Sequence, residues 1–302
     1  MRAGLLVMAY GTPASPADVE AYYTHIRRGR PPTPEQLADL VRRYDAIGGI
    51  SPLAARTAGQ RRALEIAIGD GWVVEQGNKH AAPFVEDGAA ALVAAGVDHV
   101  VGVVLAPHYS AFSVGQYHER ARASLPESVT YAGVDHWYDL DAFVDHQASA
   151  LGALLDQAPD RTKVLFTAHS LPERVLEGDA YPDQLAASAA AIAERAGLLR
   201  WGDWGIAWQS AGRTPEPWRG PDILAVIEDL ADTGRADGVI VVPHGFTSDH
   251  LEVVYDLDIE AAQLAARRGL WFARTPVVND DQAVMRELAE RAADRLVAAG
   301  PS

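Results

Sequence analysis

The chain has 302 residues, 48% of them hydrophobic and 22% charged, which is typical of a globular protein with two domains or one large α/β domain. Its 26 Lys and Arg and 41 Asp and Glu give a net charge of −15, which argues against binding to nucleic acid or to an anionic membrane surface. Cysteine is absent, so disulfides, cysteine-ligated zinc, cysteine-ligated iron–sulfur clusters and thiol nucleophiles are excluded.

No apolar run reaches the roughly 18 residues that a membrane-spanning helix requires. The apolar segment 4–9 is too short for the core of a signal peptide, and a turn-forming Gly11-Thr12-Pro13 sequence follows it closely. We therefore predict a cytoplasmic protein that does not insert stably into a membrane.

Short apolar runs rich in β-branched residues alternate with helical patterns along the whole chain. Eight of these runs have the length of a strand: residues 4–9, 72–74, 99–106, 129–132, 163–168, 205–208, 238–242 and 270–273. Continuous runs of this kind are typical of strands buried on both faces of a parallel sheet. The alternation predicts two α/β units of similar size with four strands each, joined near residues 140–160.

Helix signals fill the gaps between these strands. Ser15 followed by Pro16 predicts a helix start, and Thr33 with Gln36 three residues later has the spacing of a capping box. Alanine-rich helical stretches follow at 88–95, 147–156 and 185–197, and a final helix is expected at 281–299. The turn after the first strand lacks the glycine spacing of a Rossmann or P-loop phosphate site, so nucleotide binding is not supported.

The carboxyl ends of the predicted strands carry side chains suited to chemistry. Ligands of open α/β sheets bind beyond these ends. The first strand ends at Tyr10, and three of the ten histidines follow later strands: His108, His169 and His244. We therefore expect the functional site at these strand ends.

Two charged features lie outside the strands. Glu252, Asp256 and Glu260 recur every four residues, which on a helix places three carboxylates on one face. A functional row of this kind would bind a divalent cation or share a proton. The alternative is a solvated acidic face, and the spacing does not decide between the two. A basic patch at 25–30 and 42–43 fits either a ligand with several carboxylates or two solvated helix ends; its residues alone favour the solvated ends.

Eight segments, in order along almost the whole chain, carry a family resemblance. They read LLVMAYGTP (5–13), YTHIRRGR (23–30), GGISPL (48–53), LAPHYS (105–110), AHSLP (168–172), WQS (208–210), GF (245–246) and SDHLEV (248–253). In these segments the chain resembles the ferrochelatase family. It looks most similar to the cysteine-free, soluble coproporphyrin III ferrochelatases of Gram-positive-type bacteria.

The resemblance implies an α/β fold of two Rossmann-like, chelatase-type domains, each with a four-stranded parallel sheet flanked by helices and with a porphyrin cleft between them. We place the domains at residues 1–146 and 147–302 and expect the final helix to pack back on the first domain. The implied reaction inserts Fe²⁺ into coproporphyrin III and releases two protons, as a step of haem biosynthesis. Iron is then a substrate, no cofactor is bound permanently, and the absence of cysteine excludes an iron–sulfur cluster.

The resemblance also implies roles for single residues. His169 and Glu252 match the inner metal site, and Tyr10 faces the metal from the other side of the macrocycle, so these three are the expected catalytic residues. The expected porphyrin contacts are Tyr10, Arg27, Arg43, Tyr44, Ser51 and Tyr117. The positions that match an outer metal site or a proton relay are His80, Asp256 and Glu260.

The chain departs from the family pattern at several places. The segment EQGNKH at 75–80 differs from the usual apolar-Gly-x-Lys-His, and His244 adds an imidazole that we expect to be partly solvated on a loop. Two alternative functions remain open: a protoporphyrin IX ferrochelatase, and a non-catalytic porphyrin- or haem-binding protein. We expect a monomer whose partners are coproporphyrin III and Fe²⁺, with transient contacts to neighbouring haem-pathway enzymes and no nucleic acid.

Overall fold

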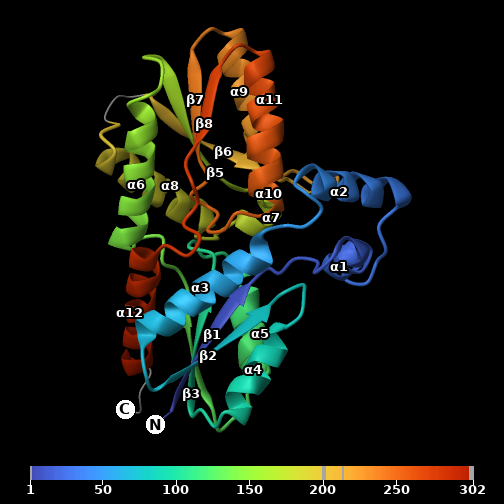
Figure 1. Ribbon diagram of the computed structural model, residues 1–302, viewed down its shortest axis with the longest axis vertical. Coiled ribbons are helices and arrows are strands. Elements are labelled where there is room, and N and C mark those ends of the chain that lie inside the picture. Colours follow the sequence, from blue (N-terminus) through green and yellow to red (C-terminus); the bar gives the residue numbers. More distant parts are fainter. Residues whose placement is uncertain (1, 199–201, 213, 299–302) are drawn as a thin grey trace.

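The computed structural model describes residues 2–198, 202–212 and 214–298 and contains two four-stranded parallel sheets (Figure 1). The first has the order β2-β1-β3-β4, with β1 (Ala3–Ala9), β2 (Trp72–Asn78), β3 (His99–Val104) and β4 (Thr130–Val134). The second has the order β6-β5-β7-β8, with β5 (Thr162–His169), β6 (Trp204–Gln209), β7 (Gly238–Val242) and β8 (Trp271–Arg274). The predicted α/β fold with two four-stranded parallel sheets is confirmed.

The strands form where the apolar runs predicted them. Every residue of β1 and of β7 is buried, because helices cover both faces of each sheet. The helices are α1 (Val19–Ile26), α2 (Pro34–Ala46), α3 (Leu53–Ile68), α4 (Val85–Ala94), α5 (Gln116–Ala123), α6 (Asp141–Leu155), α7 (Glu173–Leu176), α8 (Tyr181–Arg195), α9 (Ile223–Asp232), α10 (Leu251–Val253), α11 (Ala262–Arg267) and α12 (Gln282–Ala298). A π-helix, η3 (Val254–Ala261), joins α10 to α11.

The largest hydrophobic core runs through both units. It contains Leu5 and Val101 of the first sheet, Phe166 and Ile240 of the second, and Leu288 of α12. The helix α12 lies against α3, β3 and β4 of the first unit, beside α6 (Figure 1). The expected boundary at residue 146 falls inside α6, which as a whole packs against α8 and β7 of the second unit.

The two sequence signals for helix starts have different outcomes. The capping box is confirmed: Gln36 N–H donates to Thr33 Oγ1 at 3.3 Å, and Thr33 N–H donates to Gln36 Oε1 at 3.0 Å. The start at Ser15 is only partly right, because Ser15 precedes a 3₁₀ turn over Pro16–Asp18 and α1 begins at Val19. The Ser15 hydroxyl donates to the Asp18 carboxylate at 2.7 Å instead of capping a backbone N–H.

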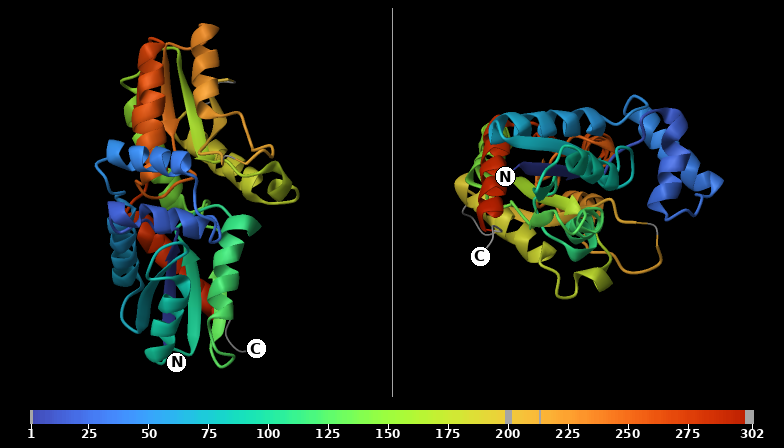
Figure 2. Two further views of the ribbon diagram at one scale, coloured as in Figure 1. Left: turned by 90° about the vertical axis from the view of Figure 1, so that its right-hand side faces the viewer. Right: turned by 90° about the horizontal axis from the view of Figure 1, so that it is seen from below.

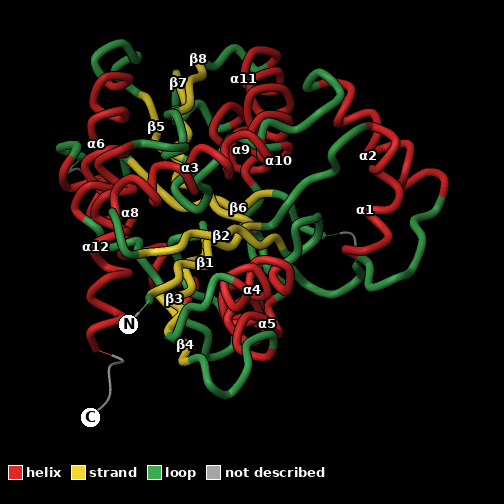
Figure 3. Tube along the Cα trace, turned by 60° about the horizontal axis from the view of Figure 1, so that its bottom comes forward, coloured by secondary structure: helices red, strands yellow, loops and turns green. Residues whose placement is uncertain are grey.

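The helices α1 and α2 project from the body of the two sheets, next to the junction between the units (Figures 1 and 2). The tube view shows the same pair set apart from all the strands (Figure 3). On the side of the second unit, Arg42 Nη1 of α2 donates to the hydroxyl of Tyr255 in η3 at 2.5 Å. No helix among the described residues combines the length and the apolar character needed to cross a membrane.

We predict that Gly245→Ala destabilises the second unit. A Cβ at residue 245 would lie 2.4 Å from the Cβ of Ala168 and 2.7 Å from its Cα, and this backbone has no room to move away. We expect a loss of about 2–3 kcal/mol in the free energy of unfolding, measured by urea denaturation. Gly205→Ala is the matched control, because nothing lies within 4 Å of a Cβ there. An equal effect of both variants would contradict the prediction.

Candidate active site at the facing strand ends

Tyr10 directly follows β1 at the carboxyl end of the first sheet. It is 45% exposed, and its ring lies 4.6 Å from the ring of His80, which follows β2. The Nδ1 atoms of His80 and of His25 in α1 are 3.0 Å apart, so one donates to the other. Desolvation, followed by the positive charge of Lys79, lowers the pKa of His80 to about 3. His80 is therefore uncharged at neutral pH and stands beside Tyr10 as a neutral imidazole.

His169 and Glu252 meet at the facing end of the second sheet. His169 is the last residue of β5, and its Nε2 lies 3.5 Å from Oε1 of Glu252 in α10. The Nδ1–H of His169 donates to the carbonyl of Ser170 at 2.5 Å, which turns Nε2 toward the carboxylate. The structure thus brings these two side chains together.

The proton between these two side chains resides on His169 and not on Glu252. Desolvation opposes the charged imidazole, but the negative charge and hydrogen bonding of Glu252 raise the pKa of His169 to about 9. Desolvation likewise opposes the charged carboxylate, but the charge of His169 holds the pKa of Glu252 well below its usual range. At neutral pH the resting pair is therefore an imidazolium and a carboxylate.

His250 is a site residue that the sequence reasoning did not assign. Its Nε2 lies 3.5 Å from Oε2 of Glu252, and its Nδ1–H donates to the carbonyl of Ser248 at 3.0 Å. The two oxygens of Glu252 thus face one imidazole each. The only sequence signal for this arrangement is that His250 is two residues before Glu252.

Asp256 lies in the π-helix η3, four residues after Glu252. Its Oδ2 accepts from the Ser210 hydroxyl at 2.5 Å, and its Oδ1 lies 3.2 Å from Nη1 of Arg43. Desolvation and the negative charge of Glu252 raise the pKa of Asp256 to about 6, with a smaller contribution from Glu260. Asp256 can therefore gain and lose a proton near neutral pH, which a solvated acidic face would not do.

Ser210 is held in a backbone conformation that the sequence does not reveal. Its φ of 59° lies in the left-handed region, which is unusual for a residue other than glycine. This backbone directs its hydroxyl to Asp256. Strain of this kind persists where the surrounding structure holds it, often at functional sites.

The outer group of three residues is not brought together as a metal site. Within residues 2–198, 202–212 and 214–298, no three His, Asp or Glu side chains are arranged to hold one ion. His80 contacts Tyr10 and His25 on the first unit, whereas Asp256 and Glu260 both lie in η3 of the second. The three residues were grouped because the family resemblance implied an outer metal site or a proton relay at these positions.

The residues expected to contact a porphyrin have mixed environments. Tyr44, Ser51 and Tyr117 are buried, with the Tyr44 hydroxyl 3.4 Å from Thr12 Oγ1 and the Ser51 hydroxyl accepting from Leu53 N–H at 3.3 Å. Arg27 is partly exposed, with its guanidinium 5.6 Å from the ring centroid of Tyr23.

Arg43 differs from its expected role as a free anion-binding group. Besides Asp256, it is paired with Asp39, its Nε lying 3.2 Å from Oδ2, and its guanidinium packs 4.8 Å from the ring centroid of Tyr255. Both of its charged partners are carboxylates, so Arg43 already holds α2 against η3 and a ligand carboxylate would have to compete with them.

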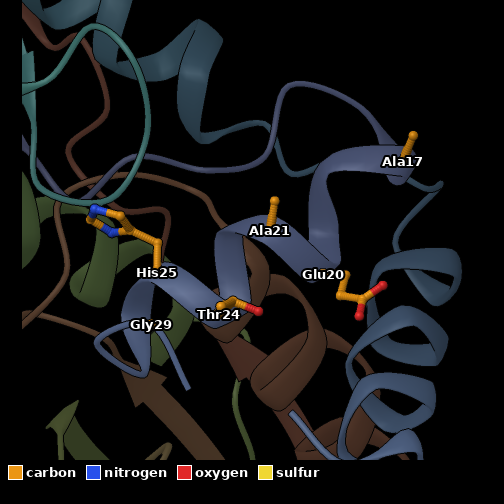
Figure 4. Close-up of a pocket in the computed structure, with 6 residues that line it drawn as sticks. All are labelled: Ala17, Glu20, Ala21, Thr24, His25 and Gly29. Atoms are coloured by element: carbon orange, nitrogen blue, oxygen red, sulfur yellow. The ribbon is translucent and has the colours of Figure 1, made fainter. Parts of the chain in front are cut away.

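The charge of Glu252 in the second unit acts on tyrosines of the first unit. Desolvation and then the charge of Glu252 raise the pKa of Tyr10 above its usual value, and Glu252 also raises the pKa of Tyr44. A hollow of about 600 Å³ lies next to this region on α1, lined by Ala17, Glu20, Ala21, Thr24, His25 and Gly29. Figure 4 shows Ala17 and Glu20 at one end of this segment and the His25 ring at the other. His25 connects the hollow to His80 and Tyr10.

The expectation that His244 is a partly solvated loop histidine is wrong. Its side chain is fully buried under α8, where Nε2–H donates to the carbonyl of Leu185 at 3.1 Å. Its ring lies 5.4 Å from the ring of buried His108, which contacts Ser188 of the same helix at 2.8 Å. The residue follows β7 directly, and α8 covers that strand exit. His244 therefore supports the interface between the units.

We predict that these buried histidines make the protein acid-sensitive. Desolvation lowers the pKa of His244 to about 4, and burial with the charge of His244 lowers that of His108 well below its usual range. The unfolded chain binds protons at these two histidines more tightly than the folded chain does. They therefore leave the free energy of unfolding undiminished above pH 6.5 and decrease it as the pH drops toward 4. For His244 this loss reaches about 3 kcal/mol. The free energy of unfolding, measured in urea between pH 6.5 and 4, should decrease less steeply with falling pH in His244→Gln than in the wild type. An equal pH dependence of the two proteins would refute the prediction.

Comparison with known proteins supplies an independent finding. A sequence profile of the ferrochelatase family matches residues 2–296. The chain is 42% identical over 310 residues to the coproporphyrin III ferrochelatase of Geobacillus thermodenitrificans, covering 98% of this chain and 97% of that protein. It is also 42% identical over 288 residues to the coproporphyrin III ferrochelatase of Bacillus subtilis, covering 91% and 92%.

Solved structures with low sequence identity share the fold. SirB from Bacillus subtilis with Fe³⁺ has a TM-score of 0.59 at 15% identity, covering 98% of this chain and 96% of that one. CbiX, the terminal enzyme of sirohaem biosynthesis in denitrifying bacteria, has a TM-score of 0.55 at 15% identity, covering 99% and 100%. Both similarities support the arrangement of two α/β units.

Proposed function

The chain belongs to the ferrochelatase family, and on this premise we propose that it inserts Fe²⁺ into coproporphyrin III to give the iron complex for haem biosynthesis. The observation that carries the proposal is the His169–Glu252 pair, 3.5 Å apart at the end of β5 and facing the strand end that carries Tyr10. A non-catalytic porphyrin carrier would not need an ion pair of this kind aimed into its ligand site.

Insertion exchanges two pyrrole N–H protons for one dication. Glu252 is ionised at rest and provides a carboxylate for the incoming iron, which is a common type of ligand for divalent metals. His169 carries a proton at neutral pH, so its Nε2 binds iron only after that proton leaves. Iron and protons therefore compete for the same pair of side chains.

The acidic row offers an exit for the protons. Asp256, whose pKa is about 6, lies four residues beyond Glu252 and has the charge of Glu260 nearby. A proton taken up by Glu252 can pass to Asp256 and then toward Glu260, which is partly exposed. We therefore assign Asp256 and Glu260 to a proton relay in the second unit.

The first unit holds the porphyrin in this proposal. Tyr10, backed by neutral His80, faces the metal from the other side of the macrocycle. In the proposal, Arg27 supplies a cationic donor for the propionates, and Tyr44, Ser51 and Tyr117 supply hydroxyl donors. Arg43 contributes where a propionate replaces one of its two carboxylate partners.

The test is anaerobic mixing of the purified protein with Fe²⁺ and either coproporphyrin III or protoporphyrin IX, followed through the porphyrin absorption bands. We expect faster metallation of coproporphyrin III. Metallation of neither porphyrin would refute the enzymatic function, and faster metallation of protoporphyrin IX would refute the choice of substrate.

We also infer the setting in which the enzyme works. We place it in the cytoplasm as a monomer without a resident cofactor, and the lack of cysteine in the chain excludes a cysteine-ligated cluster. Coproporphyrin III and Fe²⁺ are its ligands, and contacts with neighbouring haem-pathway enzymes are transient. Sedimentation velocity with and without porphyrin tests the monomer.

A further inference from the structure

The chain contains only two lysines, Lys79 and Lys163, among 26 Lys and Arg residues. Lys163 is an ordinary paired lysine: its Nζ lies 3.6 Å from Asp203 and donates to the carbonyl of Gly202 at 2.7 Å. Lys79 differs because no carboxylate of the described chain comes within 4.0 Å of its Nζ. The two lysines therefore form a natural pair for comparison.

Lys79 occupies the strand end that carries Tyr10. It directly follows β2, whose last residue pairs with Ala9, and its backbone N–H donates to the Ala9 carbonyl at 2.8 Å. Its Nζ lies 5.1 Å from the ring centroid of Tyr117 and donates to Gln116 Oε1 at 2.7 Å. An ammonium has three N–H donors, so two remain for a ligand.

The charged groups that lower the pKa of Lys79 are two arginines. Arg120 donates to the Lys79 carbonyl at 2.8 Å, but its own charge is neutralised by Glu86, which it contacts through two nitrogens at 2.9 and 2.7 Å. Desolvation, Arg120 and Arg28 together lower the pKa of Lys79 to about 8. A partly buried ammonium without an anion is unfavourable, and this one lies in a protein with a net charge of −15.

Arg28 adds a second cation without a partner. In the described part of the chain its guanidinium makes no ion pair, and its φ of 57° places a residue other than glycine in the left-handed region. The next residue, Gly29, also has positive φ, at 82°. From this turn after α1, the charge of Arg28 contributes to the lowered pKa of Lys79.

We propose that Lys79 is a specificity-determining residue that binds a carboxylate of the porphyrin, with Arg28 adding to the positive potential. This inference rests on the proposed function, because it names a further residue of the same substrate site. The Tyr117 ring lies beside the ammonium, and the exposed Tyr10 follows the neighbouring strand β1, which fits a carboxylate carried on a macrocycle better than a small inorganic anion. Among the described residues Lys79 has no carboxylate partner, whereas Arg43 is paired with two carboxylates.

The test measures the Kd of metal-free coproporphyrin III by fluorescence quenching. We expect Lys79→Met to weaken binding about tenfold or more, because a charge-assisted hydrogen bond is lost. Lys79→Arg keeps the charge and should stay within a few-fold of the wild type. Lys163→Met is the matched control and should leave the Kd unchanged. Equal Kd values for Lys79→Met and the wild type, or equal losses in Lys79→Met and Lys79→Arg, would overturn the proposal.

Two further measurements separate charge from a merely structural role. The deficit of Lys79→Met should shrink at high salt, because the lost term is electrostatic. The tetramethyl ester of coproporphyrin III, which has no carboxylates, should bind the wild type and Lys79→Met equally, and a tenfold difference for the ester would overturn the proposal. Because no iron is present, a wild type that binds porphyrin but never metallates it refutes the proposed function and leaves this inference standing.

Discussion

His169→Ala is expected to lower the rate of iron insertion by about a thousandfold while leaving porphyrin affinity within a few-fold of the wild type. The imidazole contributes Nε2 to the pair with Glu252, and its other nitrogen is engaged by Ser170. Removing it takes away a metal ligand and the positive partner that keeps Glu252 ionised. The propionate-binding side chains of the first unit are untouched, so the macrocycle should still bind.

The measurement has two parts. Stopped-flow or steady-state metallation gives the rate, and fluorescence quenching with metal-free coproporphyrin III gives the Kd of the same variant. His99→Ala, at the start of β3, is a control for the loss of an imidazole elsewhere. Wild-type turnover in His169→Ala would refute the role of this residue, and a large loss of porphyrin affinity would move its role from the metal to the substrate.

The strand framework was predictable because burial on both faces leaves a local signal. The run 238–242 coincides with β7, and the run 4–9 misses β1 by one residue. Since parallel strands place their carboxyl ends at one edge, the same runs located His169 and Tyr10 correctly. The capping box at Thr33 was equally predictable, because both of its hydrogen bonds join residues three apart.

The partners within the site were not predictable, because they come from distant segments. Asp256 is held by Arg43, 213 residues away, and by Ser210, 46 residues away. Neither contact leaves a periodic trace in the sequence. The same is true of His244, which looked like a loop residue because only the three-dimensional fold places α8 over the exit of β7.

The acidic row shows how a correct spacing can accompany an incorrect local geometry. The expected arrangement was an α-helix, but residues 254–261 form a π-helix, whose hydrogen bonds join residues five apart. Such wide turns are often found at functional sites. The carboxylates still act on each other, since both Glu252 and Glu260 raise the pKa of Asp256. What changed is that Asp256 is buried and paired, whereas Glu252 and Glu260 are partly exposed.

Glu252→Gln should remove the charge that defines the site with almost no change in shape. We expect iron insertion to fall by about a hundredfold to a thousandfold, because the amide neither accepts a pyrrole proton nor neutralises a dication. The variant also tests the electrostatics of the pair. Without the carboxylate, desolvation dominates, and the pKa of His169 should fall from about 9 to below its usual value of 6.5.

The protonation state of His169 at pH 7 should differ between the wild type and Glu252→Gln. In the wild type, His169 is protonated at pH 7 and its Nε2 becomes free for a metal as the pH rises toward 9; in Glu252→Gln it should be neutral at pH 7 already. NMR titration of the histidine ring signals distinguishes the two states. Glu260→Gln is the matched control, since it removes the same charge from a residue that does not contact His169 and should leave this pKa near 9. If the pKa of His169 stays near 9 in Glu252→Gln, another group holds the proton, and the ion pair is not the device that couples proton release to metal binding.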